Sequence, residues 1–320
     1  MSAPTFRSRA PWVLVLIAAT LPSLASSQTD AVTKKLTLEM YLDLESVSNP
    51  QISPDGARIV YTRGWVDKMN DRRESSIWIM NADGSKNHFL VDGSGPLWSP
   101  DGTRIAYTAR GEPEGSQIFV RWMDDEGATT QITRLEKGPG GIAWSPDGES
   151  LSFSMNVDGE PAWSVSPPGR PDGATWIEGP KVVTRADYRQ DRQGFVDEGW
   201  QHIFVVPAEG GTPRQLTNGD WNHSSGRWTA DGNELLFSSL RTEDSELSWR
   251  ESEVYAVNVA TEEIRQLTTR RGQDTSPLPS PRGDLVAYRG SDFNTDTYRN
   301  SGVYVMNLDG SGSRLISGDF

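Results

Sequence analysis

Ser53-Pro54-Asp55-Gly56 is the first copy of a turn sequence that recurs along the chain, and its recurrence decides the fold. Proline presets φ for the first turn position, aspartate can accept hydrogen bonds from its own backbone, and glycine accepts a positive φ. Each copy therefore predicts a hairpin turn that leads into a strand. The later copies, some of them partial, are Ser99–Gly102, Ser145–Gly148, Thr229–Gly232 and Ser280–Gly283.

The residues after each turn have the spacing of a strand. An aliphatic residue stands three positions after the final glycine and an aromatic residue stands five positions after it, so both side chains lie on one face of the strand. The aliphatic residues are Ile59, Ile105, Leu151, Leu235 and Val286. The aromatic residues are Tyr61, Tyr107, Phe153, Phe237 and Tyr288.

A second apolar motif alternates with the first and completes a repeating unit. It is followed by a turn and a short strand such as Arg214–Thr217, and another short strand such as Ile142–Trp144 leads into the next turn sequence. Four antiparallel strands per period of about 45 residues are typical of a propeller blade. The sequence predicts an all-β fold, an incomplete β-propeller of four-stranded antiparallel blades with WD40-like repeats. The copies of the second motif are Ile77–Asn81, Ile118–Val120, Ile203–Pro207, Val254–Asn258 and Val303–Asn307.

Two sets of repeated residues have a structural and a functional interpretation. Asp55, Asp101 and Asp147 could be catalytic acids, but their repetition at one turn position favours a role in the turns. Trp98, Trp144 and Trp228 each precede a turn sequence by one residue. They could form an aromatic box for a ligand, but a large ring at one blade position favours the core between blades.

The turn sequences are 46, 46, 84 and 51 residues apart, so one interval is nearly two periods long and holds either a degenerate blade or a large insertion. We expect a loop-rich insertion at about residues 155–200, because its first half is rich in proline, which lacks the donor needed for a strand ladder. Its second half, residues 184–195, is charged and aromatic. Long ordered loops often carry binding functions, yet a solvated insertion without a ligand fits this composition equally well.

The first 25 residues have the pattern of a signal peptide. Arg7 and Arg9 precede the ten apolar residues Trp12–Leu21, and Ser23-Leu24-Ala25 supplies the small residues of a cleavage site. Ten residues are too few to cross about 30 Å of hydrocarbon, so we expect no stable membrane insertion after cleavage. The pattern predicts an exported protein, periplasmic or secreted, whose propeller domain comprises residues 26–320.

Composition excludes several classes of function. The net charge of −13 argues against a nucleic-acid or anionic-membrane partner, since both need concentrated Lys and Arg. The chain has no cysteine and no close pair of histidines, so we expect no disulfide, no thiol chemistry, no metal site and no cofactor.

The middle of the chain resembles a known family. Trp176–Pro180, Arg185–Asp191, Gly194-Phe195 and Gln201–Thr217 are similar to the same region of bacterial acylaminoacyl-peptidase and dipeptidyl-peptidase-like enzymes of the prolyl oligopeptidase family. Leu36–Leu42 resembles the start of those enzymes. The turn sequences alone are shared with TolB-like propellers, so the middle segment separates the two groups.

The resemblance implies an N-terminal propeller that restricts access to an α/β-hydrolase domain with a Ser, Asp and His triad. No serine in this chain has glycine at both −2 and +2, so no nucleophile elbow is present. His88, His202 and His223 are not expected to form a triad. We therefore expect the hydrolase domain, and every catalytic residue, to be absent from these 320 residues.

The resemblance also indicates which residues line the substrate cavity, namely Arg185, Tyr188, Arg189, Asp191 and Phe195. An arginine there could bind a peptide carboxylate bidentately, and an aspartate could hold a free amino terminus. On this interpretation the chain is the gating segment of an exported serine peptidase, whose peptide substrate is cleaved by the hydrolase domain. The alternative is a stand-alone, exported TolB-like propeller that binds a protein partner.

Overall fold

The computed structural model describes residues 35–318, apart from residues 125, 160–167, 178–181, 193, 197, 297 and 299. The signal peptide predicted at residues 1–25 lies outside the described residues, as does Gly179-Pro180 of the segment that resembles peptidases. Among the described residues, no helix has the length and apolar character that crossing a membrane requires.

The chain divides into two compact units, residues 1–41 and 42–320. A short helix, α1 (Leu38–Leu42), lies at the end of the first unit. The Thr37 hydroxyl accepts a hydrogen bond from the Met40 N–H at 3.2 Å, which caps the start of this helix.

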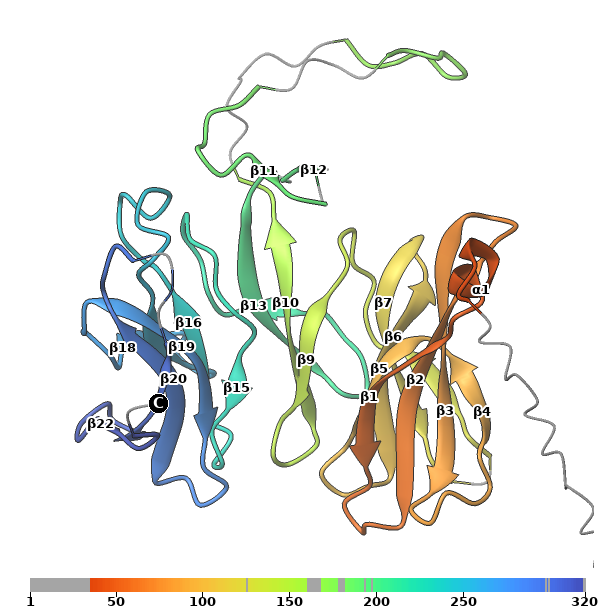
Figure 1. Cartoon of the computed structure of the whole chain (residues 1–320), viewed down its shortest axis with the longest axis horizontal. Helices are drawn as coiled ribbons and strands as arrows, with labels where there is room; N and C mark the ends of the chain where they lie inside the picture. The colour runs from red at the N-terminus through yellow and green to blue at the C-terminus, as the bar shows by residue number, and fades with distance from the viewer. Residues whose placement is uncertain are drawn as a thin grey trace, which may run out of the picture. The chain divides into compact units, whose positions relative to one another are not determined.

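The second unit contains five four-stranded antiparallel sheets among the described residues, and the predicted propeller blades are thereby confirmed (Figure 1). Blade 1 consists of β1 (Ser46–Ile52), β2 (Arg58–Asp67), β3 (Arg72–Asn81) and β4 (His88–Asp92). Blade 2 consists of β5 (Ser94–Trp98), β6 (Arg104–Gly111), β7 (Gly115–Trp122) and β8 (Thr129–Gln131). Blade 3 consists of β9 (Gly140–Trp144), β10 (Ser150–Val157), β13 (Trp200–Pro207) and β14 (Arg214–Gln215). Blade 4 consists of β15 (Arg227–Trp228), β16 (Glu234–Ser239), β17 (Glu253–Asn258) and β18 (Ile264–Gln266), and blade 5 of β19 (Gly272–Pro279), β20 (Leu285–Asp292), β21 (Gly302–Asn307) and β22 (Arg314–Leu315).

Each turn sequence connects the first and second strands of a blade. In blade 1 the Ser53 hydroxyl donates to Asp55 Oδ1 at 2.5 Å, and the same oxygen accepts the Ala57 N–H at 3.0 Å. Gly56 has φ +73° and donates its N–H to the Ser53 carbonyl at 2.8 Å. In blade 2 the Ser99 hydroxyl, which donates to Asp101, lowers the pKa of that carboxyl to about 2. The repeated aspartates therefore stabilise their own turns.

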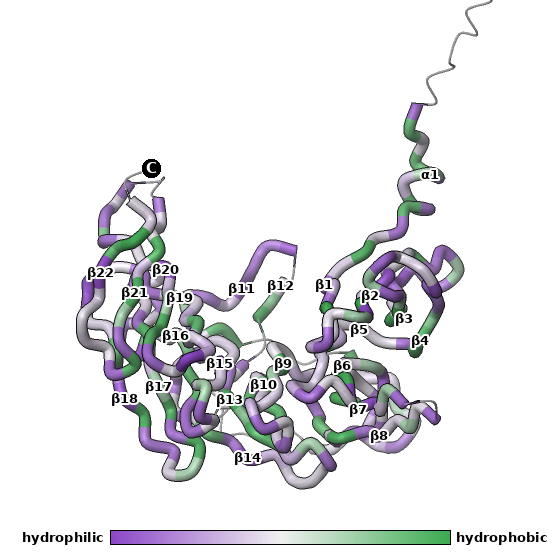
Figure 2. The backbone as a smooth tube through the Cα atoms, turned by 90° about the horizontal axis from the view of Figure 1, so that it is seen from below, coloured by the Kyte–Doolittle hydropathy of each residue, from purple (hydrophilic) through white to green (hydrophobic). Residues whose placement is uncertain are grey.

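The hydrophobic residues of successive strands form an apolar core between each pair of consecutive blades. Figure 2, which colours the backbone by hydropathy, shows hydrophobic segments along the strands of the blades. In each core the aliphatic and aromatic residues that follow a turn sequence, such as Leu235 and Phe237, face the preceding blade. The repeated tryptophans also join blades through their indole N–H groups. Trp98 donates to Gln51, Trp144 to Leu97 and Trp228 to Ala143, at 3.1, 3.1 and 3.3 Å from the carbonyl oxygens.

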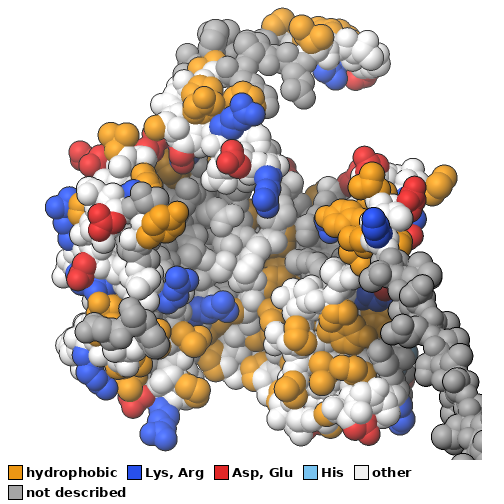
Figure 3. Space-filling view, viewed as in Figure 1, with side chains coloured by type: hydrophobic (Ala, Val, Ile, Leu, Met, Phe, Trp, Pro, Cys, Tyr) orange, Lys and Arg blue, Asp and Glu red, His pale blue; other side chains and the backbone are white. Residues whose placement is uncertain are grey.

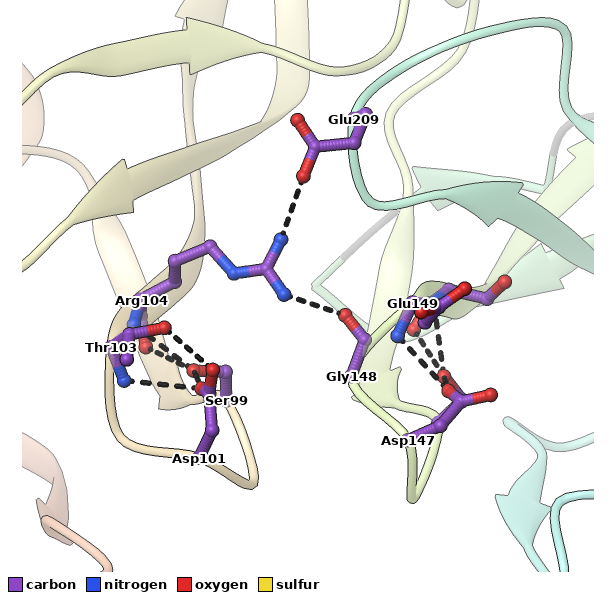
Figure 4. Close-up of polar contacts among 10 residues, drawn as sticks. Ser99, Asp101, Thr103, Arg104, Asp147, Gly148, Glu149 and Glu209 are labelled. Atoms are coloured by element: carbon purple, nitrogen blue, oxygen red, sulfur yellow. Dashed lines mark hydrogen bonds and ion pairs between the residues drawn. The ribbon is translucent and has the colours of Figure 1, made fainter.

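Arg104 is a second kind of connection, between blades 2 and 3 (Figure 4). Its guanidinium donates to the Gly148 carbonyl at 2.8 Å and to Glu209 at 3.0 Å. It also lies over the rings of Trp122 and Trp144, at 5.0 and 5.1 Å from their centroids. Because Arg104 itself is only 9% exposed, these contacts stabilise a cation that is almost wholly removed from water, although its Nε has no hydrogen-bond partner among the described residues.

The 84-residue interval is explained by the order of strands in blade 3. β10 ends at Val157 and its neighbour β13 begins at Trp200, so residues 158–199 are inserted between two strands that pair with each other. The described part of this insertion contains only the two-residue strands β11 (Arg189–Gln190) and β12 (Gly194–Phe195). The interval is an insertion within one blade.

Candidate functional site

The insertion and one loop of blade 4 lie at the same end of their blades. In an antiparallel blade, the connection between the second and third strands lies opposite the connection between the first and second. The insertion connects the second and third strands of blade 3, and residues 240–252 connect the second and third strands of blade 4. We call this end, opposite the turn sequences, the loop end (Figure 1).

Arg185 fastens the insertion to the loop of blade 4. Its guanidinium contacts Asp187 at 2.8 and 3.0 Å and Glu246 at 3.2 Å, and it lies 3.6 Å from the centroid of the Trp200 ring. Glu246 also accepts the Ala186 N–H at 2.8 Å. Two carboxylates and an aromatic ring thus already occupy this guanidinium, so its observed role is to position the loop.

The other four residues predicted to line the substrate cavity lie together on the hairpin formed by β11 and β12. Arg189 pairs with Phe195 across the hairpin, and Asp191 lies in its turn. The rings of Tyr188 and Phe195 are 6.1 Å apart and these residues are 45% and 47% exposed. On the described part of the insertion, hydrophobic and basic side chains are exposed next to each other (Figure 3). Contact of these four residues and of Arg185 with a substrate remains a prediction.

A row of aromatic rings in mutual contact lies in the core between blades 3 and 4 at the loop end. The centroid distances are 5.1 Å from His202 to His223, 5.2 Å from His223 to Phe237 and 5.6 Å from Phe237 to Tyr255. His223 is 2% exposed, and burial lowers its pKa to about 4. This histidine is therefore neutral at pH 7.

Arg241 contacts this row of rings from the segment that directly follows β16. Its Nη1–H donates to His223 Nε2 at 2.8 Å, and its guanidinium lies 4.7 Å from the Trp221 ring and 6.0 Å from the Tyr255 ring. Sequence reasoning did not identify Arg241 or Trp221. The only local signal was Trp221-Asn222-His223 shortly before a turn sequence, and its partner Arg241 is 18 residues away from His223.

Acidic residues of blades 4 and 5, Glu253 and Asp274, interact near the loop end. Asp274 is fully buried, and Arg270 binds both Asp274 and, at 3.2 Å, Asp292. Burial raises the pKa of Glu253 to about 7, and the negative charge of Asp274 adds to this rise. Within the part of the chain that the structure describes, no group of three or more His, Cys, Asp or Glu side chains could hold a metal ion.

Comparison with known proteins gives the relatives of this fold. Residues 170–297 match the dipeptidyl peptidase IV (DPP IV) N-terminal region. The chain is 27% identical over 221 residues to the uncharacterized peptidase YuxL of Bacillus subtilis and 24% identical over 282 residues to dipeptidyl-peptidase 5 of Porphyromonas endodontalis. These matches support the resemblance of this chain to the propeller portion of the prolyl oligopeptidase family.

The matches cover most of this chain and a smaller part of the two peptidases. They cover 67% and 82% of this chain, which spans 33% and 39% of the lengths of these relatives. Among solved structures, an acylaminoacyl peptidase superposes with a TM-score of 0.66 at 17% identity, over 88% of this chain and 40% of that one. A putative TolB from Agrobacterium tumefaciens has a TM-score of 0.50 at 19% identity, over 85% of this chain and 80% of that one.

Proposed function

We propose that this propeller is the access-controlling part of an exported serine peptidase and that its loop end faces the peptide substrate. The observation that carries the proposal is the match of residues 170–297 to the dipeptidyl peptidase IV N-terminal region. This range includes the Tyr188–Phe195 hairpin, the ion pair between Arg185 and Glu246, and Arg241. The matched region therefore contains the loop-end residues of blades 3 and 4 described above.

The contacts at the loop end suit a peptide. The exposed rings of Tyr188 and Phe195 offer apolar surface to side chains, and the exposed Arg189 offers charge-assisted hydrogen bonds to carboxylates. Because the chain contains no Gly-x-Ser-x-Gly sequence, the bond-breaking step is assigned to a hydrolase domain. The role of this propeller is to admit and orient short peptides.

Export is the second part of the proposal. It rests on the basic residues, apolar run and small residues of the first 25 positions. Protein produced in a Gram-negative bacterium and recovered from the periplasm should begin near Ser26 when its N-terminus is sequenced. Recovery of chains that still begin at Met1 would contradict export by this signal.

The reading frame beyond codon 320 provides the first test of peptidase function. We expect it to encode Gly-x-Ser-x-Gly followed by Asp and His, and we expect the protein made from it to cleave chromogenic peptides. In that protein, changing both Tyr188 and Phe195 to alanine should raise KM severalfold and leave kcat nearly unchanged, because the rings are proposed to bind substrate equally in the ground and transition states. Unchanged KM would show that the hairpin does not bind substrate.

A second candidate function is binding of a protein partner by a stand-alone propeller. The observation that favours it is the shared propeller fold, since the chain superposes on the putative TolB with a TM-score of 0.50. A stop codon after Phe320 followed by an unrelated gene would support this candidate.

A further inference from the structure

Arg241 is a partly buried cation held by uncharged groups. Its guanidinium lies against the rings of Trp221 and Tyr255, and its one hydrogen bond among the described residues runs from Nη1 to His223 Nε2 at 2.8 Å. Its Nε and Nη2 have no hydrogen-bond partner among these residues, and neither atom is fully buried. The N–H groups of both atoms are thus available as donors to a ligand.

The protonation of His223 follows from its two contacts. Its Nδ1–H donates to the Gln201 carbonyl at 3.0 Å, which leaves Nε2 as the acceptor for the Arg241 N–H. Since burial also keeps this histidine neutral at pH 7, it orients Arg241 but adds no counter-charge. His223 therefore fixes the direction of the guanidinium and leaves its positive charge unbalanced.

Within the described part of the chain, no carboxylate forms an ion pair with Arg241. Burial lowers its pKa, and no acidic side chain contributes to the shift. Asp220, near in sequence, acts on the neighbouring His202. Removing an unpaired cation from water costs free energy, and an anionic ligand would offset that cost.

Arg185 provides an internal comparison. It too stacks on a tryptophan at the loop end, but two carboxylates of the chain bind it. The two arginines belong to one loop cluster, because Arg185 is held by Glu246, which lies in the same 240–252 loop as Arg241. Of the two, only Arg241 retains the capacity to bind a carboxylate from outside the chain.

We propose that Arg241, oriented by His223 and stacked on Trp221, binds the terminal carboxylate of a short peptide. The guanidinium fork matches a carboxylate with two parallel hydrogen bonds, and the aromatic rings around it exclude water from one side. The choice of a peptide as the source of the carboxylate rests on the proposed function, whereas the carboxylate site rests on the contacts of Arg241 alone.

The test is a titration of the 320-residue chain with N-acetyl-Ala-Phe as the free acid, as the amide, and with N-acetyl-Glu-Phe-amide, measured by calorimetry. The free acid should bind at least about tenfold more tightly than Ala-Phe-amide, because only the acid offers the bidentate partner. The Glu peptide separates a side-chain carboxylate from a terminal one. Equal binding of free acid and amide, or tighter binding of the Glu peptide than of the free acid, would overturn the assignment to a terminal carboxylate.

Three variants locate the site. Arg241→Gln should weaken binding of the free acid at least about tenfold, and Arg241→Lys should restore part of it because a lysine keeps the charge but loses the fork. Arg289→Gln removes an exposed arginine whose side chain has no hydrogen bond or ion pair among the described residues and is the matched control, with unchanged binding. If Arg241→Gln does not fold, as judged by circular dichroism, competition against the wild-type chain replaces it, and acetate should compete where acetamide does not. Wild-type affinity in a folded Arg241→Gln variant, or the absence of acetate competition, would refute the site.

This result and the proposed peptidase function can fail separately. Carboxylate binding that depends on Arg241, in a protein that cleaves no peptide, would uphold the site and refute the peptidase. Peptide cleavage together with binding that ignores Arg241→Gln would do the reverse.

Discussion

At the scale of single residues, Arg104 shows how a blade interface depends on one buried cation. Replacing it with methionine keeps most of the apolar stem but leaves the Gly148 carbonyl without its partner. We expect Arg104→Met to lower the free energy of unfolding by about 2 kcal/mol, measured by urea denaturation. The exposed Arg289→Met control should stay within about 0.5 kcal/mol, and an equal loss in both variants would contradict the assigned role.

Glu253 should make the stability of the fold depend on pH. Its pKa in the folded chain is raised to about 7 from the ordinary 4.5, so between these values the folded state binds more protons than the unfolded state. Stability should therefore fall as pH rises from about 5 to 7 and level off above that. Because the side chain is only partly buried, we expect the loss to be about 1 kcal/mol.

The variant Glu253→Gln tests this dependence. Glutamine still accepts the hydrogen bond from the Thr268 hydroxyl but carries no charge, so its melting temperature should exceed that of the wild type at pH 8 and match it near pH 5. Glu263→Gln, at an exposed position of the same blade, should leave the pH profile unchanged. A wild-type profile in Glu253→Gln would place the titrating group elsewhere.

At the scale of secondary-structure elements, the sequence predicted the blades well because their signals are local. A Ser-Pro-Asp-Gly turn and an apolar residue two positions from an aromatic one specify hairpin and strand face within ten residues. The Arg241 site could not be predicted in this way. It is assembled from Gln201, Trp221, His223 and Tyr255, which belong to two blades and share no spacing that a short motif could reveal.

The insertion offers a test at the same scale. Glu246→Gln removes the charge that binds Arg185, while Glu243→Gln changes an exposed residue of the same loop. We expect Glu246→Gln to increase the rate of proteolytic cleavage within residues 158–199 severalfold, since local opening no longer has to break the ion pair. Mass spectrometry of the fragments would locate the cuts. Equal cleavage rates in the two variants would show that the Arg185–Glu246 ion pair does not hold the insertion in place.

At the scale of the whole molecule, blade 5 exposes an apolar face whose counterpart in blades 2 to 4 is buried against the blade that follows. Four isoleucine, leucine or valine pairs occupy equivalent positions in blades 2 to 5, defined by the same hydrogen bond from the fourth-strand N–H to the third-strand carbonyl. In blade 4, Val254 and Leu267 are 0% and 6% exposed, whereas Val303 and Ile316 of blade 5 are 40% and 53% exposed. The equivalent residues of blades 2 and 3, Ile118 with Ile132 and Ile203 with Leu216, are buried against the blade that follows.

This face predicts that the 320-residue chain associates with itself. Apolar surface of the kind that packs four blade interfaces favours association when left in water, and an exposed sheet face next to strand edges promotes aggregation. Sedimentation of the purified chain should show concentration-dependent oligomers, and changing both Val303 and Ile316 to lysine should shift the chain toward monomer. Met69→Lys, at a position 91% exposed but outside any blade face, is the control and should leave the oligomers unchanged. A wild-type chain that sediments as a monomer and unfolds in one sharp transition would show that the exposed face is tolerated in water.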